Sequence, residues 1–311
     1  MCGIFGFINY KNKPLKNLSN LTNLLAEESA VRGTDATGIS FVSDDEICIL
    51  KEAKSAYDVS FKHSDSVKAL IGHTRHSTQG SCKNNQNNHP FLGHCKNGEF
   101  SLAHNGVLFN DADLKIKYDL PKTNIKTDSY VAVQLLERQN ELTTDSIRFM
   151  AENVQGSFSF SILDDKNNIW LVKGDSPVEI LKFPEYGLIV YASTEVILWR
   201  ALIDTKLLGE IKAGRYERIP INEGDILKLT PTGEVKKYGF NYCEFSDVKS
   251  CNWWNYGNYG IYGTGYEDMY IADLKAVAAY QGYSPEDIDE LLENGFAPEE
   301  VEEYIYCMNE V

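Results

Sequence analysis

Hydrophobic and polar residues alternate over most of the first 240 residues, and the period of this alternation predicts mainly β-strands. In the segment 156–163, two phenylalanines and an isoleucine at every second position face serines, which is typical of a half-buried strand. Two pairs of runs are separated by the turn sequences Asp44-Asp45 and Pro231-Thr232-Gly233, and each pair predicts a hairpin. The expected strands are 3–10, 38–42, 46–52, 70–75, 99–104, 156–163, 169–173, 178–183, 188–192, 225–230 and 234–238.

Four segments have the character of helices. The clearest is an apolar face of leucines that recur every three or four residues: Leu15, Leu18, Leu21, Leu24 and Leu25. The other helices are expected at 128–137, 144–153 and 194–205. Because the strands look antiparallel and the helices come in separate blocks, we expect an α+β fold in which sheets are layered with helices.

The composition changes after residue 240. Residues 241–266 mix tyrosine and tryptophan with asparagine and glycine and hold little charge, so we interpret them as a linker packed on the body by its aromatic residues, or alternatively as a partner-binding surface. Residues 267–311 hold an internal repeat, in which the segment 282–288 returns 13 residues later as 295–301. Each copy carries a proline followed by acids, which predicts two short helices in a small acidic hairpin. The expected domains are therefore 2–240, 241–266 and 267–311.

Charge and composition exclude several classes of function. The net charge of the 311 residues is −15, and the segment 267–311 holds 13 acidic residues against one base, Lys275, so the remainder is nearly neutral. Neither part offers the basic surface that nucleic acid requires. There is no run of roughly 18 apolar residues and no secretory leader, so we expect no membrane span. Seven cysteines without a disulfide-scaffold spacing favour reduced thiols in the cytoplasm.

Cys2 is the first residue with chemical interest. Removal of a methionine before a small residue such as cysteine exposes a free α-amino group, and this amine can act as the base for the thiol of the same residue. A cysteine at the second position is weak evidence alone. It is followed by five further short blocks, and the six blocks are Cys2-Gly3-Ile4-Phe5-Gly6, 32–38 (Arg-Gly-Thr-Asp-Ala-Thr-Gly), 72–80 (Gly-His-Thr-Arg-His-Ser-Thr-Gln-Gly), Asn88-His89-Pro90-Phe91, Ala103-His104-Asn105-Gly106 and Thr127-Asp128-Ser129.

In their order and separations, these blocks resemble the class II glutamine amidotransferases, which are glutaminase domains of the N-terminal-nucleophile hydrolase superfamily. The resemblance covers Cys2 to about Tyr238. It implies a four-layer αββα sandwich of two mostly antiparallel sheets, here followed by the small C-terminal helical hairpin. It also implies that L-glutamine is the substrate.

The resemblance further implies roles for six residues. Cys2 corresponds to the nucleophile, while the side-chain amide of Asn105 and the backbone N–H of Gly106 correspond to the oxyanion hole. Arg75 offers a planar cation for the α-carboxylate of glutamine, and Asp128 offers a carboxylate for its α-ammonium. Thr78 is expected to add contacts to the substrate. Asp35 is interpreted as a structural residue that bonds the loop near the nucleophile.

The loop after Arg75 departs from the family pattern. It reads His76-Ser77-Thr78-Gln79, where many relatives carry an aromatic residue first and a histidine near the end, and this concerns loop closure and ammonia retention. All six histidines fall between residues 63 and 104, but no zinc spacing is present, so we expect no metal. No phosphate-binding or nucleotide motif is found either, and we expect no cofactor.

About 73 residues follow Tyr238, too few for the synthase domain that such glutaminases usually serve. We therefore expect a stand-alone amidotransferase subunit that forms a γ-glutamyl thioester on Cys2 and delivers ammonia to a separately encoded synthase. Two alternatives stay open. One is a γ-glutamyl peptidase acting on γ-glutamyl conjugates, and the other is a catalytically silent binding or regulatory module.

Overall fold

The structure is a computed structural model that describes residues 2–11, 16–242 and 283–293, with residues 271, 274, 275, 278 and 301. The chain divides into two compact units, Cys2–Phe245 and the remainder, 246–311. The predicted linker 241–266 lies outside the described residues except at its first two positions.

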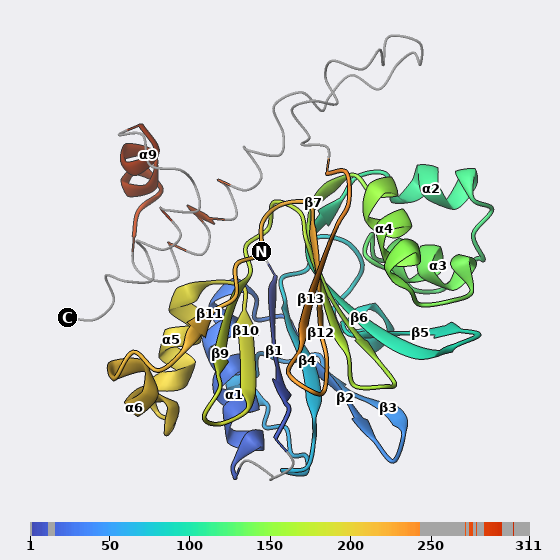
Figure 1. The fold of residues 1–311 in the computed structure, drawn as a ribbon. Helices are drawn as coiled ribbons and strands as arrows, with labels where there is room; N and C mark the ends of the chain where they lie inside the picture. The colour runs from blue at the N-terminus through green and yellow to red at the C-terminus, as the bar shows by residue number, and fades with distance from the viewer. Residues whose placement is uncertain are drawn as a thin grey trace. The chain divides into compact units, whose positions relative to one another are not determined.

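Two antiparallel sheets form the first unit (Figure 1). In the first, the strand order is β11-β9-β10-β1-β4-β2-β3, and in the second it is β13-β12-β8-β7-β6-β5. The first sheet contains β1 Gly3–Asn9, β2 Ala36–Ser43, β3 Glu46–Glu52, β4 Ala69–Arg75, β9 Glu179–Phe183, β10 Leu188–Ala192 and β11 Glu217–Arg218. The second contains β5 Phe91–Cys95, β6 Gly98–Leu108, β7 Gly156–Asp164, β8 Ile169–Lys173, β12 Asp225–Leu229 and β13 Val235–Gly239.

Helices cover the outer face of each sheet. The first sheet carries α1 and α5, and the second carries α3 and α4. The helices of this unit are α1 Leu18–Ser29, α2 Asp111–Lys117, α3 Tyr130–Gln139, α4 Thr144–Asn153, α5 Glu195–Ile203 and α6 Leu207–Lys212, with 3-10 turns η1 Ala30–Arg32, η2 Ala56–Asp58 and η3 Asn85–Asn87. The layers are therefore helix, sheet, sheet and helix, as the sequence predicts.

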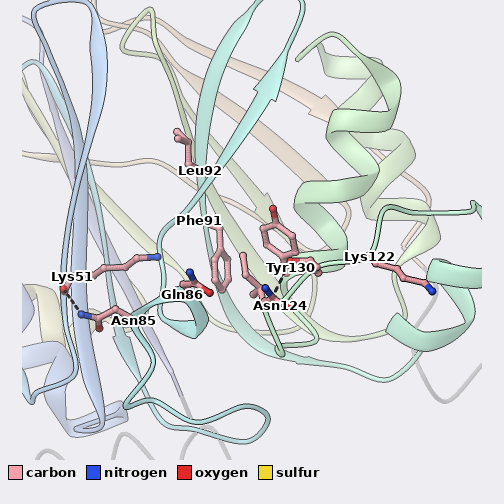
Figure 2. A pocket seen from close by; sticks show the side chains of 10 residues that line it. Lys51, Asn85, Gln86, Phe91, Leu92, Lys122, Asn124 and Tyr130 are labelled. Carbon is pink, nitrogen blue, oxygen red and sulfur yellow. Dashed lines mark hydrogen bonds between the residues drawn. The ribbon is translucent and has the colours of Figure 1, made fainter.

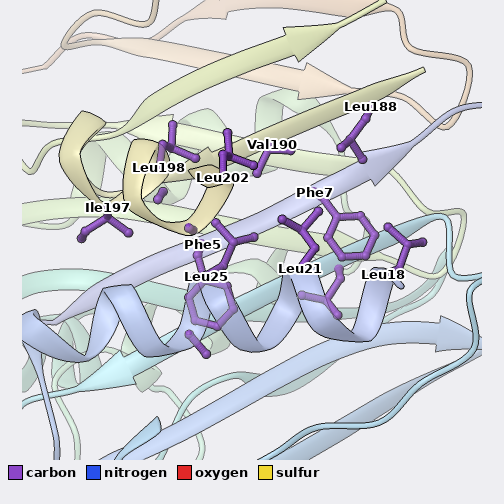
Figure 3. Packing of buried hydrophobic residues seen from close by; sticks show 14 of the residues in the cluster. Phe5, Phe7, Leu18, Leu21, Leu25, Leu188, Val190, Ile197, Leu198 and Leu202 are labelled. Atoms are coloured by element: carbon purple, nitrogen blue, oxygen red, sulfur yellow. The ribbon is translucent and has the colours of Figure 1, made fainter. Parts of the chain in front are cut away.

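Strand β1 shows why the sheets pack in this way. All seven of its residues are buried, and its side chains alternate between two cores. Phe5 and Phe7 face α1 and α5, where they meet leucines such as Leu21 and Leu198 (Figure 3). Ile4 and its equivalents on other strands belong to a separate cluster between the two sheets. An apolar residue at every position of β1 thus indicates a strand that is covered on both faces.

Most predicted elements are found, with small shifts at their ends. The helix predicted at 144–153 has those bounds, and Thr143 caps it in a capping box with Ser146. Helix α3 begins two residues later than predicted, and α1 begins at Leu18, while Leu15 lies outside the described residues. Among the described strands and α-helices, the sequence did not predict β5, α2, α6 and β11.

In the second unit, the structure describes one predicted helix of the acidic repeat. Helix α9, Pro285–Glu293, begins at the proline, and Ser284 accepts a hydrogen bond from the Asp287 N–H at 3.2 Å. Asp289 forms an ion pair with Lys275 at 2.5 Å. The second copy of the repeat lies outside the described residues except for Val301, so the predicted hairpin stays a prediction.

Candidate functional site

The first site residues meet where two neighbouring strands end and begin. Gly3 pairs with Thr74 in the antiparallel ladder of β1 and β4, so Cys2 comes next to Arg75 at the same edge of the sheet. The Cys2 thiol lies 3.5 Å from the carbonyl oxygen of His76. The register of β1 and β4 therefore places the predicted nucleophile beside the predicted cation.

Burial dominates the electrostatics of Cys2. It raises the pKa of the thiol above its ordinary value, and the Asp128 carboxylate acts in the same direction. The positive charges of the N-terminal amine and of the Arg75 guanidinium act in the opposite direction without cancelling the effect of burial. At neutral pH the thiol is thus protonated, and it needs a base before it can attack.

The guanidinium of Arg75 is buried and holds the loop that follows it. Nη1 donates to Asn88 Oδ1 at 2.6 Å, and Nη2 donates to the carbonyl oxygens of Gln79 at 2.6 Å and Gly80 at 3.0 Å. A carboxylate can bind a guanidinium in two bidentate geometries, one through Nε and Nη2 and the other through Nη1 and Nη2. Each geometry uses a hydrogen of Nη2. A bidentate carboxylate would therefore replace one of the two loop carbonyls.

Asp128 lies just before α3, and one of its two carboxylate oxygens can still accept a hydrogen bond from a ligand. Its Oδ2 accepts from the Leu108 N–H at 2.7 Å, while Ser129 Oγ lies 2.8 Å from His104 Nδ1 and 3.5 Å from Asp128 Oδ1. Burial lowers the pKa of His104, so the ring is neutral, and its Nε2 lies 3.3 Å from the Ser157 carbonyl oxygen. Nε2 therefore carries the ring proton, and Nδ1 accepts the only hydroxyl proton of Ser129. This leaves Asp128 Oδ1 able to accept from a cation.

Asn105 and Gly106 lie near the end of β6, a strand that packs against β1 and β4 of the facing sheet. Asn105 is 1% exposed, and its Nδ2 has no hydrogen-bond partner among the described residues. Gly106 has a φ of 130°, and a Cβ at this position would collide with the Ser157 carbonyl. A buried, unpaired amide donor is costly, which is expected when its partner is a ligand.

The six predicted residues are not all equally close to one another in the structure. Arg75 and Asp128 are both close enough to Cys2 to shift the pKa of its thiol, and Asp128 is bonded to the strand that carries Asn105. Thr78 is exposed in the loop after Arg75, and no hydrogen bond joins it to the other five among the described residues.

Three histidines stack behind the site. The ring centroids of His73 and His89 are 4.1 Å apart, and those of His89 and His104 are 6.5 Å apart. Burial lowers the pKa of His73 to about 3 and that of His89 well below its ordinary value, so the stack is uncharged at neutral pH. His73 Nε2 donates to the His104 carbonyl at 2.9 Å, which fixes the peptide before Asn105.

Sequence reasoning assigned no role to Asn88 or to this stack, although both lie in the six blocks. The only signal was their place in those blocks, because the contact of residue 88 with residue 75 depends on the path of a loop. The structural interpretation of Asp35 is confirmed, since its Oδ2 accepts from the Ser77 N–H at 2.7 Å and its own N–H donates to the Arg75 carbonyl at 2.9 Å.

Two kinds of feature are absent from the described residues. No group of three or more His, Cys, Asp or Glu side chains is arranged to hold a metal ion in that part of the chain. No helix among the same residues is both long and apolar enough to cross a membrane.

Comparisons with known proteins agree with this geometry. A family model described as a glutamine amidotransferase domain matches residues 73–196. The glutamine–fructose-6-phosphate aminotransferase (isomerizing) of Staphylococcus epidermidis is 36% identical over 187 residues, which cover 57% of this chain and 30% of that protein. That of Staphylococcus aureus is 36% identical over 188 residues, with the same coverage. Residues 73–196 are thus similar to a glutamine amidotransferase domain.

The fold of the chain also occurs in a solved structure. The glutamine phosphoribosylpyrophosphate amidotransferase of B. subtilis has a TM-score of 0.60 and 22% identity, and the match covers 77% of this chain and 49% of that one. At this identity the likeness shows the fold alone, and it confirms the predicted αββα class. The chain spans 30% of the length of the curated relatives named above, so their other activities do not carry over directly.

Proposed function

We propose that the chain hydrolyses the side-chain amide of L-glutamine to glutamate and ammonia through a γ-glutamyl thioester on Cys2. The observation that carries this is the convergence of a thiol, a guanidinium and a carboxylate at the ends of β1 and β4 and before α3. These are the groups that a free α-amino acid with a reactive side chain requires.

Substrate binding uses the two charged ends of the amino acid. The α-carboxylate pairs with Arg75 and displaces a carbonyl of Gln79 or Gly80, so the loop 76–80 rearranges as glutamine enters. The α-ammonium pairs with the open Oδ1 of Asp128. Thr78 lies on the loop that moves, and it contacts the substrate only after this rearrangement.

The chemistry then follows from the buried, protonated thiol. With Met1 removed, the α-amine of Cys2 takes the thiol proton, the sulfur attacks the amide carbon, and a C–S bond forms. The oxyanion accepts hydrogen bonds from Asn105 Nδ2 and the Gly106 N–H. The C–N bond breaks as the amine returns the proton to the leaving ammonia, and water then hydrolyses the thioester to glutamate.

The wider setting is part of the same proposal. Residues 2–240 form the catalytic domain, and ammonia passes to a separately encoded synthase in the cytoplasm, for which the aromatic segment 241–266 and the acidic segment 267–311 offer docking surfaces. The four cysteines in the described part of the chain are free thiols, which supports a reducing compartment.

Intact mass spectrometry with 6-diazo-5-oxo-L-norleucine tests the proposal, because this glutamine mimic alkylates an activated thiol in a glutamine pocket. We expect loss of Met1 and one adduct that maps to Cys2, together with ammonia release from glutamine, and neither adduct nor turnover in Cys2→Ala. A retained Met1 with no adduct would overturn the proposal. Faster cleavage of γ-glutamyl-p-nitroanilide than of glutamine would redirect it to γ-glutamyl conjugates.

A further inference from the structure

A cavity lies beside the proposed glutamine site. It has a volume of about 620 Å³ and lies between β3, β5, the loop 81–90 and the segment 121–127 that leads to Asp128 (Figure 2). Its rim consists of exposed polar side chains, among them Gln86 and Asn124, and its floor is apolar, with Phe91 and Tyr130. The two rings meet edge to face, with their centroids 5.4 Å apart.

One cation reaches into this cavity. The side chain of Lys51 extends from β3 toward Gln86 and Phe91, and its Nζ lies 5.3 Å from the centre of the Phe91 ring (Figure 2). Lys122 also lines the cavity, but its side chain extends away from the two rings (Figure 2). No acidic residue is among the ten that line the cavity. The floor therefore combines apolar surface with one uncompensated positive charge.

The ammonium of Lys51 is partly desolvated, and not all of its hydrogens are bonded within the protein. Nζ donates to the carbonyl oxygens of Asn88 at 2.7 Å and Pro90 at 3.1 Å, which takes two of its three hydrogens. Burial lowers the pKa of Lys51 to about 8, and a bound anion would favour the charged form. The third hydrogen is available to a ligand in the cavity.

The cavity also touches both halves of the proposed amino-acid clamp. Lys51 holds the Asn88 carbonyl, and the Asn88 side chain accepts from Arg75 at 2.6 Å. On the opposite wall, the segment 121–127 runs directly into Asp128, and the Lys126 N–H donates to Asn87 Oδ1 at 2.9 Å. A ligand between these two segments would contact the supports of both Arg75 and Asp128.

We propose that this cavity binds a small anion carrying a flat apolar group, such as an aromatic carboxylate, and that its occupancy strengthens glutamine binding. The carboxylate pairs with Lys51, the ring lies on the floor formed by Phe91 and Tyr130, and the rim amides bond the remaining oxygen. If the anion has already ordered the loop 81–90 and the segment 121–127, glutamine has less conformational freedom to remove when it binds. The two ligands therefore strengthen each other's binding. The coupling, but not the anion site, rests on the proposed function.

Calorimetric titration of the full chain with benzoate tests the site. We expect benzoate to bind at one site, and benzamide and acetate to bind at least about tenfold more weakly because each lacks one of the two features. Lys51→Met should weaken benzoate binding about tenfold or more, while Lys122→Met, the matched control, should not. Because Lys51 also supports two carbonyls, Asn124→Trp provides a second variant that fills the cavity from its exposed rim and should abolish binding.

The coupling is measured as the affinity of Cys2→Ala for glutamine, so that it does not require turnover. We expect saturating benzoate to raise this affinity about fivefold, and we expect no change in Asn124→Trp. Absence of benzoate binding, or equal binding by the wild type, Lys51→Met and Asn124→Trp, would overturn the site. If benzoate binds without changing glutamine affinity, the coupling is wrong. If glutamine itself does not bind, the proposed function fails and the coupling with it, while the benzoate result still decides the anion site.

Discussion

Asn105 illustrates how single residues define this site. Its side chain is buried in β6, yet its amide nitrogen has no partner among the described residues, an arrangement that costs about 1–3 kcal/mol. The neighbouring His104 and Asp128 side chains are hydrogen-bonded, whereas Thr127 Oγ1 and both ring nitrogens of His89 have no partner among the described residues. An unpaired donor at this position is expected for a group that bonds a transient oxyanion.

We predict that Asn105→Ala lowers kcat for glutamine hydrolysis by about 10²–10³-fold with little change in KM, because the lost donor acts in the transition state. The free energy of unfolding should change by less than about 1 kcal/mol, since no bond between described residues is lost through Nδ2. Steady-state kinetics and urea denaturation measure the two quantities. A large loss of stability with normal kcat would show that Asn105 is structural.

The assignment of the Ser129 proton to His104 can be tested at Asp128. Asp128→Asn should raise KM for glutamine about 30-fold or more, because a buried charge pair with the α-ammonium is lost. Ser129→Ala should instead cost about 1–3 kcal/mol of stability, through the unpaired His104 Nδ1, and should leave KM within a few-fold of the wild type. An equal rise of KM in both variants would mean that Ser129 donates to Asp128.

Among the elements, the central strands were predictable and the short peripheral ones were not. Strands β1, β7 and β10 carry alternating or continuous apolar residues, so their own sequences are enough to predict them. Strand β5 has no alternation, and it forms because Phe91 pairs with Leu102 of β6. Helices α2 and α6, with seven and six residues, are too short to show a helical period. The same limit applies to the site, since the ordered blocks indicated six residues but not the Asn88–Arg75 contact.

The histidine stack between β4, β6 and the loop before β5 predicts acid sensitivity. The pKa of each histidine is lower in the folded state than its ordinary value of 6.5, so the unfolded chain binds more protons as the pH falls below that value. The free energy of unfolding should thus decrease from about pH 6.5 toward pH 3, by at most about 1.4 kcal/mol per pH unit for each histidine.

His89→Phe isolates one member of the stack, because neither ring nitrogen of His89 has a partner among the described residues. Over this range, the variant should reduce the slope of the unfolding free energy against pH by the contribution of one histidine, which is at most about 1.4 kcal/mol per pH unit. Urea denaturation at several pH values measures the slope. An unchanged slope would show that His89 does not contribute to acid unfolding.

At the scale of the whole molecule, two units differ in charge. The body 2–240 is nearly neutral, while 267–311 carries 13 acidic residues and one lysine. The cores described above are built from residues of the first unit, with Phe240 and Tyr242 the last residues that join them. We therefore expect residues 2–240 to carry catalysis and residues 267–311 to carry association with a partner.

Deletion of residues 267–311 tests this separation. We expect the melting temperature and the basal glutaminase activity of the shortened chain to stay close to those of the full chain, because the core and the proposed site lie within residues 2–242. Co-purification with the proposed synthase partner should be lost. If the synthase still binds, the docking surface lies elsewhere, and a large loss of basal activity would show that the segment supports the catalytic domain.

The position of β1 has a consequence for the order in which a growing polypeptide acquires its chemistry. This first strand lies between β4 and β10, and the Ile4 N–H donates to the Ser193 hydroxyl at 2.9 Å. A nascent chain on the ribosome therefore cannot complete the surroundings of Cys2 until residues near 193 have emerged. The thiol is made long before Ser193 and becomes competent only when Ser193 is in place, so unfinished chains would not release ammonia.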